Sequence, residues 1–98
     1  MVKCMNVKVQ YFALVREMVG LRDEVLNLAH GSTVLDLLKI LATRHTQLKD
    51  YLFDPKTAMP RPNLQFLVDD HLISALKGFE TPMTKDCTVA IIPPVGGG

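Results

Sequence analysis

One long amphipathic helical segment constrains this chain more than any other feature. From Val34 onward, apolar residues recur at the i, i+3, i+4 and i+7 spacing, and polar residues cover the other side. Thr33 precedes the segment and Asp36 follows it by three positions, which approximates a capping box. We predict a helix over 34–46, with an extra turn over 51–53. Because one such helix has one apolar stripe, the remaining chain must supply a sheet face for it to cover.

Period-two alternation and β-rich runs predict the strands of that sheet. The last run is uncharged, and a strand that is polar on neither face is usually central and covered. Gly20 is expected to end a short helical turn, and Asp69-Asp70 to form a hairpin turn. The expected strands are 5–12, 23–28, 64–68, 71–74 and 87–92, the short helical turn is 13–19, and a Pro-rich loop covers 54–63.

The element order (strand, strand, helix, strand, strand, strand) predicts an α+β fold. The first and last strands are strongly apolar on one face, so we place them side by side at the centre of a mixed sheet. A sheet of four to five strands packed on one main helix is the β-grasp, or ubiquitin-like, roll. We expect a single β-grasp domain over 1–92, followed by a flexible tail over 93–98.

Composition excludes several classes of partner. The 98 residues fit one domain, and a net charge of +1 leaves no electrostatic footprint for nucleic acid. No uncharged run approaches the roughly 18 residues of a membrane helix, and the N-terminus lacks the apolar core of a signal peptide. Two cysteines cannot form a disulfide framework. We expect a soluble, cytoplasmic protein that binds neither nucleic acid nor membranes.

Few residues indicate chemistry of the chain's own. His30, His45 and His71 lack metal-ligand spacing, so we interpret them as surface or helix-capping residues and predict no metal site and no bound cofactor. Cys4 and Cys87 stand near the starts of neighbouring strands and could approach one another. They are either a functional thiol pair or reduced packing residues, the commoner situation inside cells. Whether the chain counts as an enzyme therefore depends on a partner.

The C-terminal segment is the most informative part for function. Three consecutive glycines add nothing to a core, and Pro93-Pro94 stiffens the chain just before them. Such an arm would present the carboxylate of Gly98 away from the domain, thin enough for a narrow channel in another protein. A bare carboxylate acylates poorly, so an external enzyme would have to activate it, for example by adenylation. The alternatives are a frayed terminus or an expression scar.

Three segments resemble the MoaD-type sulfur carriers, within the wider group of ubiquitin-like carriers that includes ThiS. Residues 9–20 resemble the opening pattern YFA-x-x-RE-x-x-G of this family. Residues 31–38 resemble its helix start G-x-TV-x-x-LL, and residues 86–98 resemble its ending D-x-VA-x-x-PPV-x-GG. The first two patterns are moderately specific, and the Pro-Pro-Val ending with Gly-Gly is highly specific.

The resemblance implies the small subunit of molybdopterin synthase. In that family an E1-like adenylating enzyme of the MoeB type uses ATP to form an acyl-adenylate on the terminal glycine, here Gly98. Sulfur from a cysteine desulfurase system then gives a thiocarboxylate. The tail, with Gly96 and Gly97 as its threading arm, enters the MoaE-like large subunit and gives sulfur to precursor Z within a heterotetramer. The product later binds molybdenum or tungsten.

The resemblance also implies a face for binding the partner protein. Strand alternation agrees for one member, because Phe12 is a large apolar residue on the polar side of its strand. Leu72 and Ile92 could instead be buried. The implied partner-binding residues are Phe12, Leu72, Ile92, Pro93, Pro94 and Val95.

The segment 45–63 keeps other functions open. Compact MoaD and ThiS chains are shorter here, and this extension resembles that of ubiquitin-related modifiers and archaeal small modifier proteins. Those relatives serve tRNA thiolation or become attached to lysines. A ThiS-like carrier for thiazole synthesis and a pure β-grasp binding module are the remaining alternatives.

Overall fold

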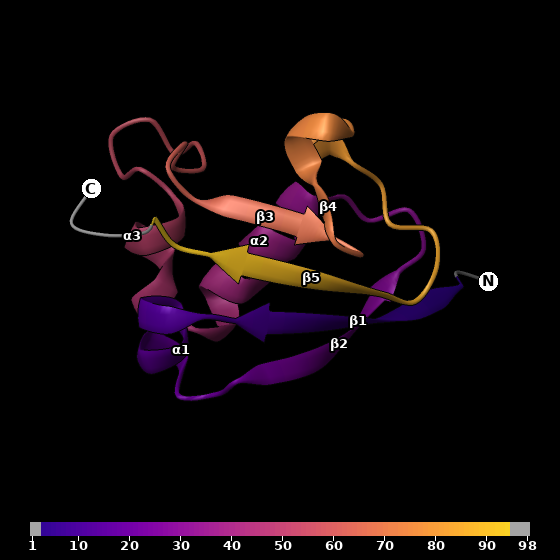
Figure 1. Ribbon diagram of the computed structural model, residues 1–98, viewed down its shortest axis with the longest axis horizontal. Coiled ribbons are helices and arrows are strands. Elements are labelled where there is room, and N and C mark those ends of the chain that lie inside the picture. The colour runs from indigo at the N-terminus through magenta and orange to yellow at the C-terminus, as the bar shows by residue number, and fades with distance from the viewer. Residues whose placement is uncertain (1–2, 95–98) are drawn as a thin grey trace.

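A mixed five-stranded sheet packs against one main helix in the computed structural model, which describes residues 3–94 (Figure 1). The strand order is β2-β1-β5-β3-β4. Strands β1 and β5 lie side by side, as predicted, and run parallel, whereas the other neighbouring strands are antiparallel. The fold is therefore the β-grasp, or ubiquitin-like, fold. The strands are β1 (Cys4–Tyr11), β2 (Asp23–Ala29), β3 (Gln65–Val68), β4 (His71–Leu72) and β5 (Cys87–Ile92).

The main helix, α2 (Val34–Arg44), begins with the predicted capping box. Thr33 Oγ1 accepts the backbone N–H of Asp36 at 3.2 Å, and the Asp36 carboxylate accepts the backbone N–H of Thr33 at 3.0 Å. The predicted end at residue 46 is wrong, because the backbone of His45 leaves the helical region (φ −123°, ψ 89°). The 3₁₀ helix η1 (Thr46–Leu48) and the short α3 (Lys49–Leu52) follow. None of the helices within residues 3–94 has the length and apolarity needed to cross a membrane.

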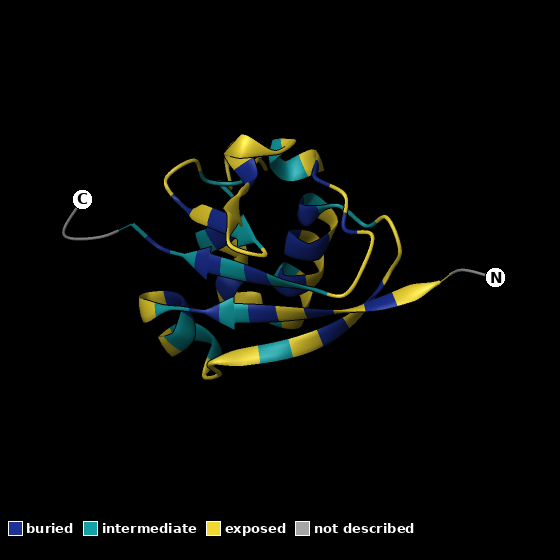
Figure 2. Cartoon of the chain, turned by 45° about the vertical axis from the view of Figure 1, so that its right-hand side comes forward, coloured by how far each residue is buried: buried dark blue, intermediate teal, exposed yellow. Residues whose placement is uncertain are grey.

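The core lies between α2 and the inner face of the sheet (Figure 2). Alternate residues of β1 are buried, and the apolar stripe of α2 is fully buried against them. Large side chains from α3 and β3 close the core at the side of the Pro-rich loop. The fully buried core residues are Val7, Val9, Tyr11, Val15, Val34, Leu37, Leu38, Leu41, Leu48, Leu52, Val89 and Ile91.

Residues with positive φ form the turns that end α1 and join β3 to β4. The helix α1 (Ala13–Val19) ends at Gly20 as predicted, where φ of +83° places the backbone in the left-handed region. Asp69 and Asp70 both have positive φ (49° and 69°), which suits a tight two-residue hairpin. The predicted strand 71–74 is too long. β4 stops at Leu72, because Ile73 turns inward to a buried position in the 3₁₀ helix η2 (Ile73–Ala75).

The Pro-rich segment 54–63 is a loop, as predicted, and it is tied to its surroundings by backbone bonds. The N–H of Asp54 donates to the carbonyl of Met59 at 2.8 Å, and that of Arg61 donates to the carbonyl of Leu52 at 2.9 Å. A third short 3₁₀ helix, η3 (Gly78–Glu80), lies on the connection to β5. The loop leads directly to the start of β3.

Candidate functional site

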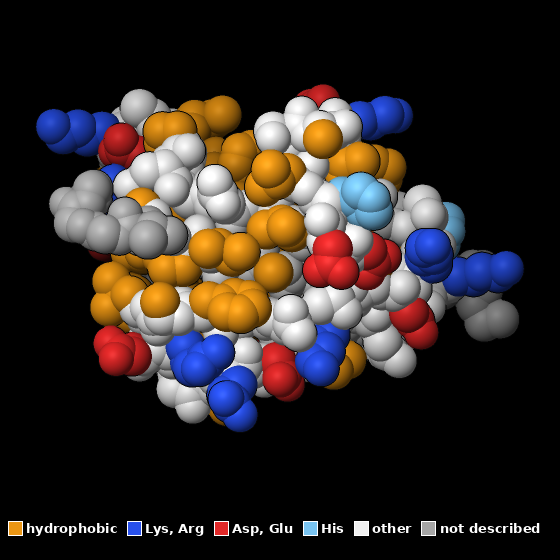
Figure 3. Space-filling view, viewed as in Figure 1, with side chains coloured by type: hydrophobic (Ala, Val, Ile, Leu, Met, Phe, Trp, Pro, Cys, Tyr) orange, Lys and Arg blue, Asp and Glu red, His pale blue; other side chains and the backbone are white. Residues whose placement is uncertain are grey.

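The sheet face turned away from α2 carries an apolar patch (Figure 3). Val89 and Ile91 point into the core, so Ala90 and Ile92 point to this outer face, where both are half-buried. Pairing extends the apolar surface across the sheet, since Ala90 stands opposite Leu67 on β3. We call this surface the outer patch; its members are Phe12, Leu67, Leu72, Ala90 and Ile92.

Phe12 joins the outer patch from the end of β1. The register pairs Tyr11 with Ile91, so Phe12 lies beside the end of β5 near Ile92. Its side chain is half-buried, and the guanidinium carbon of Arg16 lies 5.9 Å from its ring centroid. The prediction that Phe12 falls on the non-core side of β1 is confirmed.

The other predicted contact residues lie in two places, Leu72 on the β3–β4 hairpin and the two prolines just after β5. Leu72 is 42% exposed on the β3–β4 hairpin, so simple burial does not account for it. Pro93 is buried and Pro94 is half-buried, which shows that the chain is still packed as it leaves β5. Their role in partner binding stays a prediction. Val95, Gly96, Gly97 and Gly98 lie outside the described residues.

The two cysteines do not form a pair. The register sets Cys87 opposite Val7, three strand positions from Cys4, and the two residues lie on opposite faces of the sheet. Burial raises the pKa of the Cys87 thiol, and the carboxylates of Asp69 and Asp86 raise it further. Cys87 packs against the hydrophobic core, and its thiol is disfavoured from ionising. Among residues 3–94, no three His, Cys, Asp or Glu side chains gather in a cluster that could hold a metal ion.

A buried polar network on the inner face of the sheet was not predicted from the sequence. The Tyr11 hydroxyl donates to Glu24 Oε2 at 2.5 Å, and His45 Nε2 lies 2.5 Å from the same oxygen. Arg44 Nε donates to Glu24 Oε1 at 2.8 Å. His45 is thus no ordinary surface residue, because its side chain is only 14% exposed. The alternation along β2 could have indicated it, because Glu24 is two positions from Leu26 and therefore lies on the same, core-facing side of the strand.

The electrostatics of this network favour a charged Glu24. Burial alone would raise the pKa of Glu24, but hydrogen bonds from Tyr11 and His45, with the charges of His45 and Arg44, lower it overall. The pKa of Tyr11 is raised far above its ordinary value, first by burial and then by the hydrogen bond to Glu24. The network joins β1, β2 and the end of α2, so it stabilises the contact between the main helix and the sheet.

Comparison with known proteins agrees with this geometry. The sequence pattern of the ThiS family matches residues 9–98. The human molybdopterin synthase sulfur carrier subunit is 31% identical over 98 residues, which cover the whole of both chains. Small archaeal modifier protein 3 of Haloferax volcanii is 28% identical over 94 residues, covering 96% of this chain and all of that protein.

A solved structure shows the same fold over almost the full length. The solution structure of small archaeal modifier protein 1 from Methanosarcina acetivorans superimposes with a TM-score of 0.86 at 28% identity. The match covers 98% of this chain and 99% of that one. The chain therefore belongs to the ThiS family and has the ubiquitin-like fold of its sulfur carriers.

Proposed function

We propose that this protein is the sulfur-carrying small subunit of a molybdopterin synthase. The observation that carries the proposal is the exit of β5. This central strand passes the outer patch and leads through Pro93 and Pro94 into the Val-Gly-Gly-Gly sequence. A partner docked on the outer patch would therefore receive the following segment directly. The 31% identity to two molybdopterin synthase sulfur carrier subunits, human and Chlamydomonas reinhardtii, supports this role.

The chemistry proposed for Gly98 has two steps. Its carboxylate attacks the α-phosphorus of ATP on an E1-like adenylating enzyme, which forms an acyl-adenylate and releases pyrophosphate. A donor of sulfide-level sulfur then displaces AMP and leaves a thiocarboxylate. In the large subunit its sulfur bonds to precursor Z, and water cleaves the acyl–sulfur bond, which restores the Gly98 carboxylate. Gly96 and Gly97 thread the arm, since residues without Cβ pass a narrow channel most easily. We place this chemistry in the cytoplasm, with ATP consumed by the activating enzyme and no cofactor held by this chain.

The outer patch is the proposed contact with the large subunit, in a heterotetramer. Half-buried and exposed apolar side chains on one sheet face suit a protein contact, because a partner removes their remaining exposed area from water. The Arg16 side chain beside Phe12 supplies a polar edge to that contact.

The test is the intact mass of the protein after incubation with an adenylating enzyme, ATP and a sulfur source. We expect one oxygen to be replaced by sulfur, at Gly98. The matched control carries the carboxyl of Gly98 as an amide; it should fold identically and gain no sulfur. A thiocarboxylate that still forms on the amidated protein, or an unchanged mass with a proven enzyme system, would contradict the proposal.

A second candidate function is a small modifier used in tRNA thiolation or in attachment to lysines. The folded segment that follows α2, comprising η1, α3 and the tied loop 54–63, favours it. So does the structural likeness to small archaeal modifier protein 1. Isopeptide-linked conjugates in a cell extract, absent when Gly98 is deleted, would distinguish this function from sulfur transfer to precursor Z.

A further inference from the structure

Strand β3 is covered on its outer side over only half of its length. β4 pairs with Leu67 and Val68, and the chain then turns away into η2. Within residues 3–94, no strand lies beside the stretch from Leu64 to Phe66 on this side of the sheet. The sheet therefore has a short open edge next to η2 and η3.

The register shows which backbone groups that edge presents. The N–H of Asp69 donates to the carbonyl of Thr88 at 2.8 Å, which makes 69 and 88 a hydrogen-bonded pair of the antiparallel β3–β5 ladder. Bonding alternates along such a ladder, so Leu67 and Gln65 also bond toward β5. The N–H and C=O groups of Leu64 and Phe66 point the other way. Within residues 3–94, no turn or loop backbone bond reaches the N–H groups of Leu64 and Phe66, and β4 pairs no further along β3 than Leu67.

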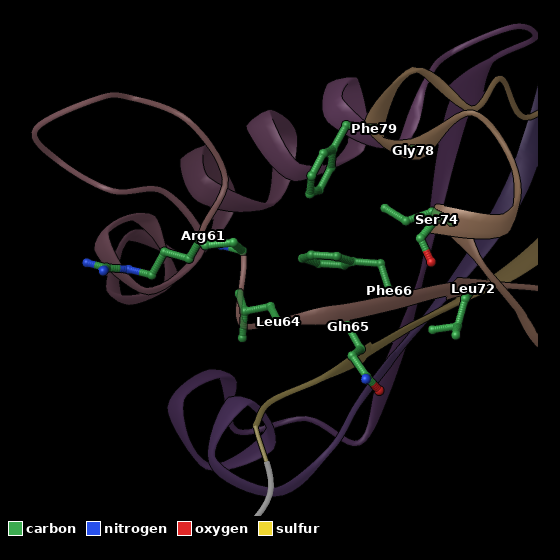
Figure 4. A pocket seen from close by; sticks show the side chains of 10 residues that line it. Arg61, Leu64, Gln65, Phe66, Leu72, Ser74, Gly78 and Phe79 are labelled. Atoms are coloured by element: carbon green, nitrogen blue, oxygen red, sulfur yellow. The ribbon is translucent and has the colours of Figure 1, made fainter. Parts of the chain in front are cut away.

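An apolar pocket of about 380 Å³ adjoins this edge (Figure 4). Its walls include the rings of Phe66 and Phe79, which meet edge-to-face with centroids 5.6 Å apart. Leu72, at the end of β4, forms another wall and also belongs to the outer patch. Arg61 stands at one end of the pocket and Ser74 at the other (Figure 4), and Pro62 also lines it.

We propose that this edge binds an extended peptide segment of a partner protein as an additional β-strand. Two residues whose backbone groups face outward on one side of β3 match the backbone of an extended chain, whereas a purely apolar ligand offers these groups no hydrogen bond. The same strand would place an apolar side chain in the pocket between Phe66 and Phe79. Leu72 belongs to the outer patch and also lines the pocket. A protein bound to the outer patch would therefore lie next to this edge.

The occupant is a single strand rather than a second copy of this chain. The pocket beside this edge is bounded by Arg61 of the Pro-rich loop on one side and by Ser74 of η2 on the other. A lone peptide can enter such a recess. A second copy cannot pair through the same edge, because the same walls flank its own edge and would collide. The proposal is independent of sulfur transfer, because it involves no residue of the tail.

The first experiment titrates the ¹⁵N-labelled full chain with the peptide acetyl-Lys-Val-Ile-Val-Lys-amide. We expect shifted, exchange-protected amides at Leu64 and Phe66. The control peptide is N-methylated at alternate residues, which removes the N–H groups of one strand side. Methylation on the side facing β3 should weaken binding about tenfold or more, because hydrogen bonds at this edge are lost. Methylation on the other side should leave the affinity unchanged.

A pair of variants tests the location. Ser74→Arg places a long side chain in the pocket and should abolish binding, whereas Ala75→Arg, next to it and also exposed, should bind as wild type. Equal binding of both methylated peptides, or shifts confined to the outer patch, would overturn strand addition. So would the absence of any shift at about 1 mM peptide, or concentration-dependent broadening of these amides in the free protein, which indicates pairing between two copies.

Discussion

The two faces of the sheet use similar residues for different purposes. On the inner face, Val9 and Ile91 are fully buried beneath α2. On the outer face, Ile92 and Phe12 are equally apolar but only half-buried, and Leu72 is 42% exposed. Apolar area that is removed from water on folding stabilises the fold, whereas area left exposed can stabilise a complex. The comparison predicts that inner substitutions change stability and outer ones change binding.

The largest effect is expected for Leu41→Ala on the apolar stripe of α2. Leu41 is fully buried, so its truncation should cost about 2–5 kcal/mol through lost transfer energy and a residual cavity. In a domain of this size each kcal/mol lowers the melting temperature by about 4–8 °C. Thermal and urea unfolding measure both quantities. The neighbouring Ile40→Ala, 40% exposed, should change stability by less than about 1 kcal/mol; an equal loss would contradict the assigned burial.

The next effect concerns the outer face and appears in binding. Phe12→Asp should weaken binding to the large subunit by about 2 kcal/mol, or ~30-fold, measured by calorimetry. Stability should be nearly unchanged or slightly raised, because Phe12 stands at the N-cap of α1 without a capping side chain and Asp is a favourable N-cap. Val25→Asp, at a 59% exposed apolar site on the edge strand β2, is the control and should bind normally. If the Phe12 variant binds with wild-type affinity, Phe12 is not part of the contact.

A smaller loss of stability is expected for Glu24→Gln. The substitution removes the negative charge that accepts hydrogen bonds from Tyr11 and Arg44, and we expect a cost of about 1–3 kcal/mol in urea unfolding. Asp23→Asn, on the exposed side of the same strand, should change stability by less than about 0.5 kcal/mol. If both variants unfold at the same urea concentration, the charge of Glu24 does not contribute to the stability of the fold.

The smallest effect is a pH dependence of stability confined to the network. The pKa of Glu24 is lowered in the folded state, so its contribution is present above the ordinary value of 4.5 and is lost as pH falls through the folded pKa. The pKa of Tyr11 is raised, so its contribution is complete below the ordinary value of 10.0 and declines as pH rises beyond it. Urea midpoints should therefore depend less on acidic pH in Glu24→Gln and less on alkaline pH in Tyr11→Phe. Parallel profiles for wild type and both variants would contradict this assignment.

Local patterns in the sequence predicted most of the fold. The stripe after Thr33 gave the position of the helix, and period-two alternation gave β1 with its correct inner face. Asp69-Asp70 marked a turn because both residues tolerate the left-handed backbone. The end of α2 was missed, because its stripe continues past His45 while the backbone does not. The exposure of Leu72 was left open, since the run from 71 to 74 reads equally as a longer strand.

What the sequence determined by itself is therefore the set of elements, their buried faces and the Pro-Pro-Val-Gly-Gly-Gly segment, because each depends on residues a few positions apart. Only the tertiary structure decided which distant residues meet. The Tyr11–Glu24–His45 network joins three elements, the outer patch joins four segments, and the open edge of β3 depends on where β4 stops. These contacts follow from strand register and packing, which fix positions relative to the whole sheet, and no local periodicity carries that information.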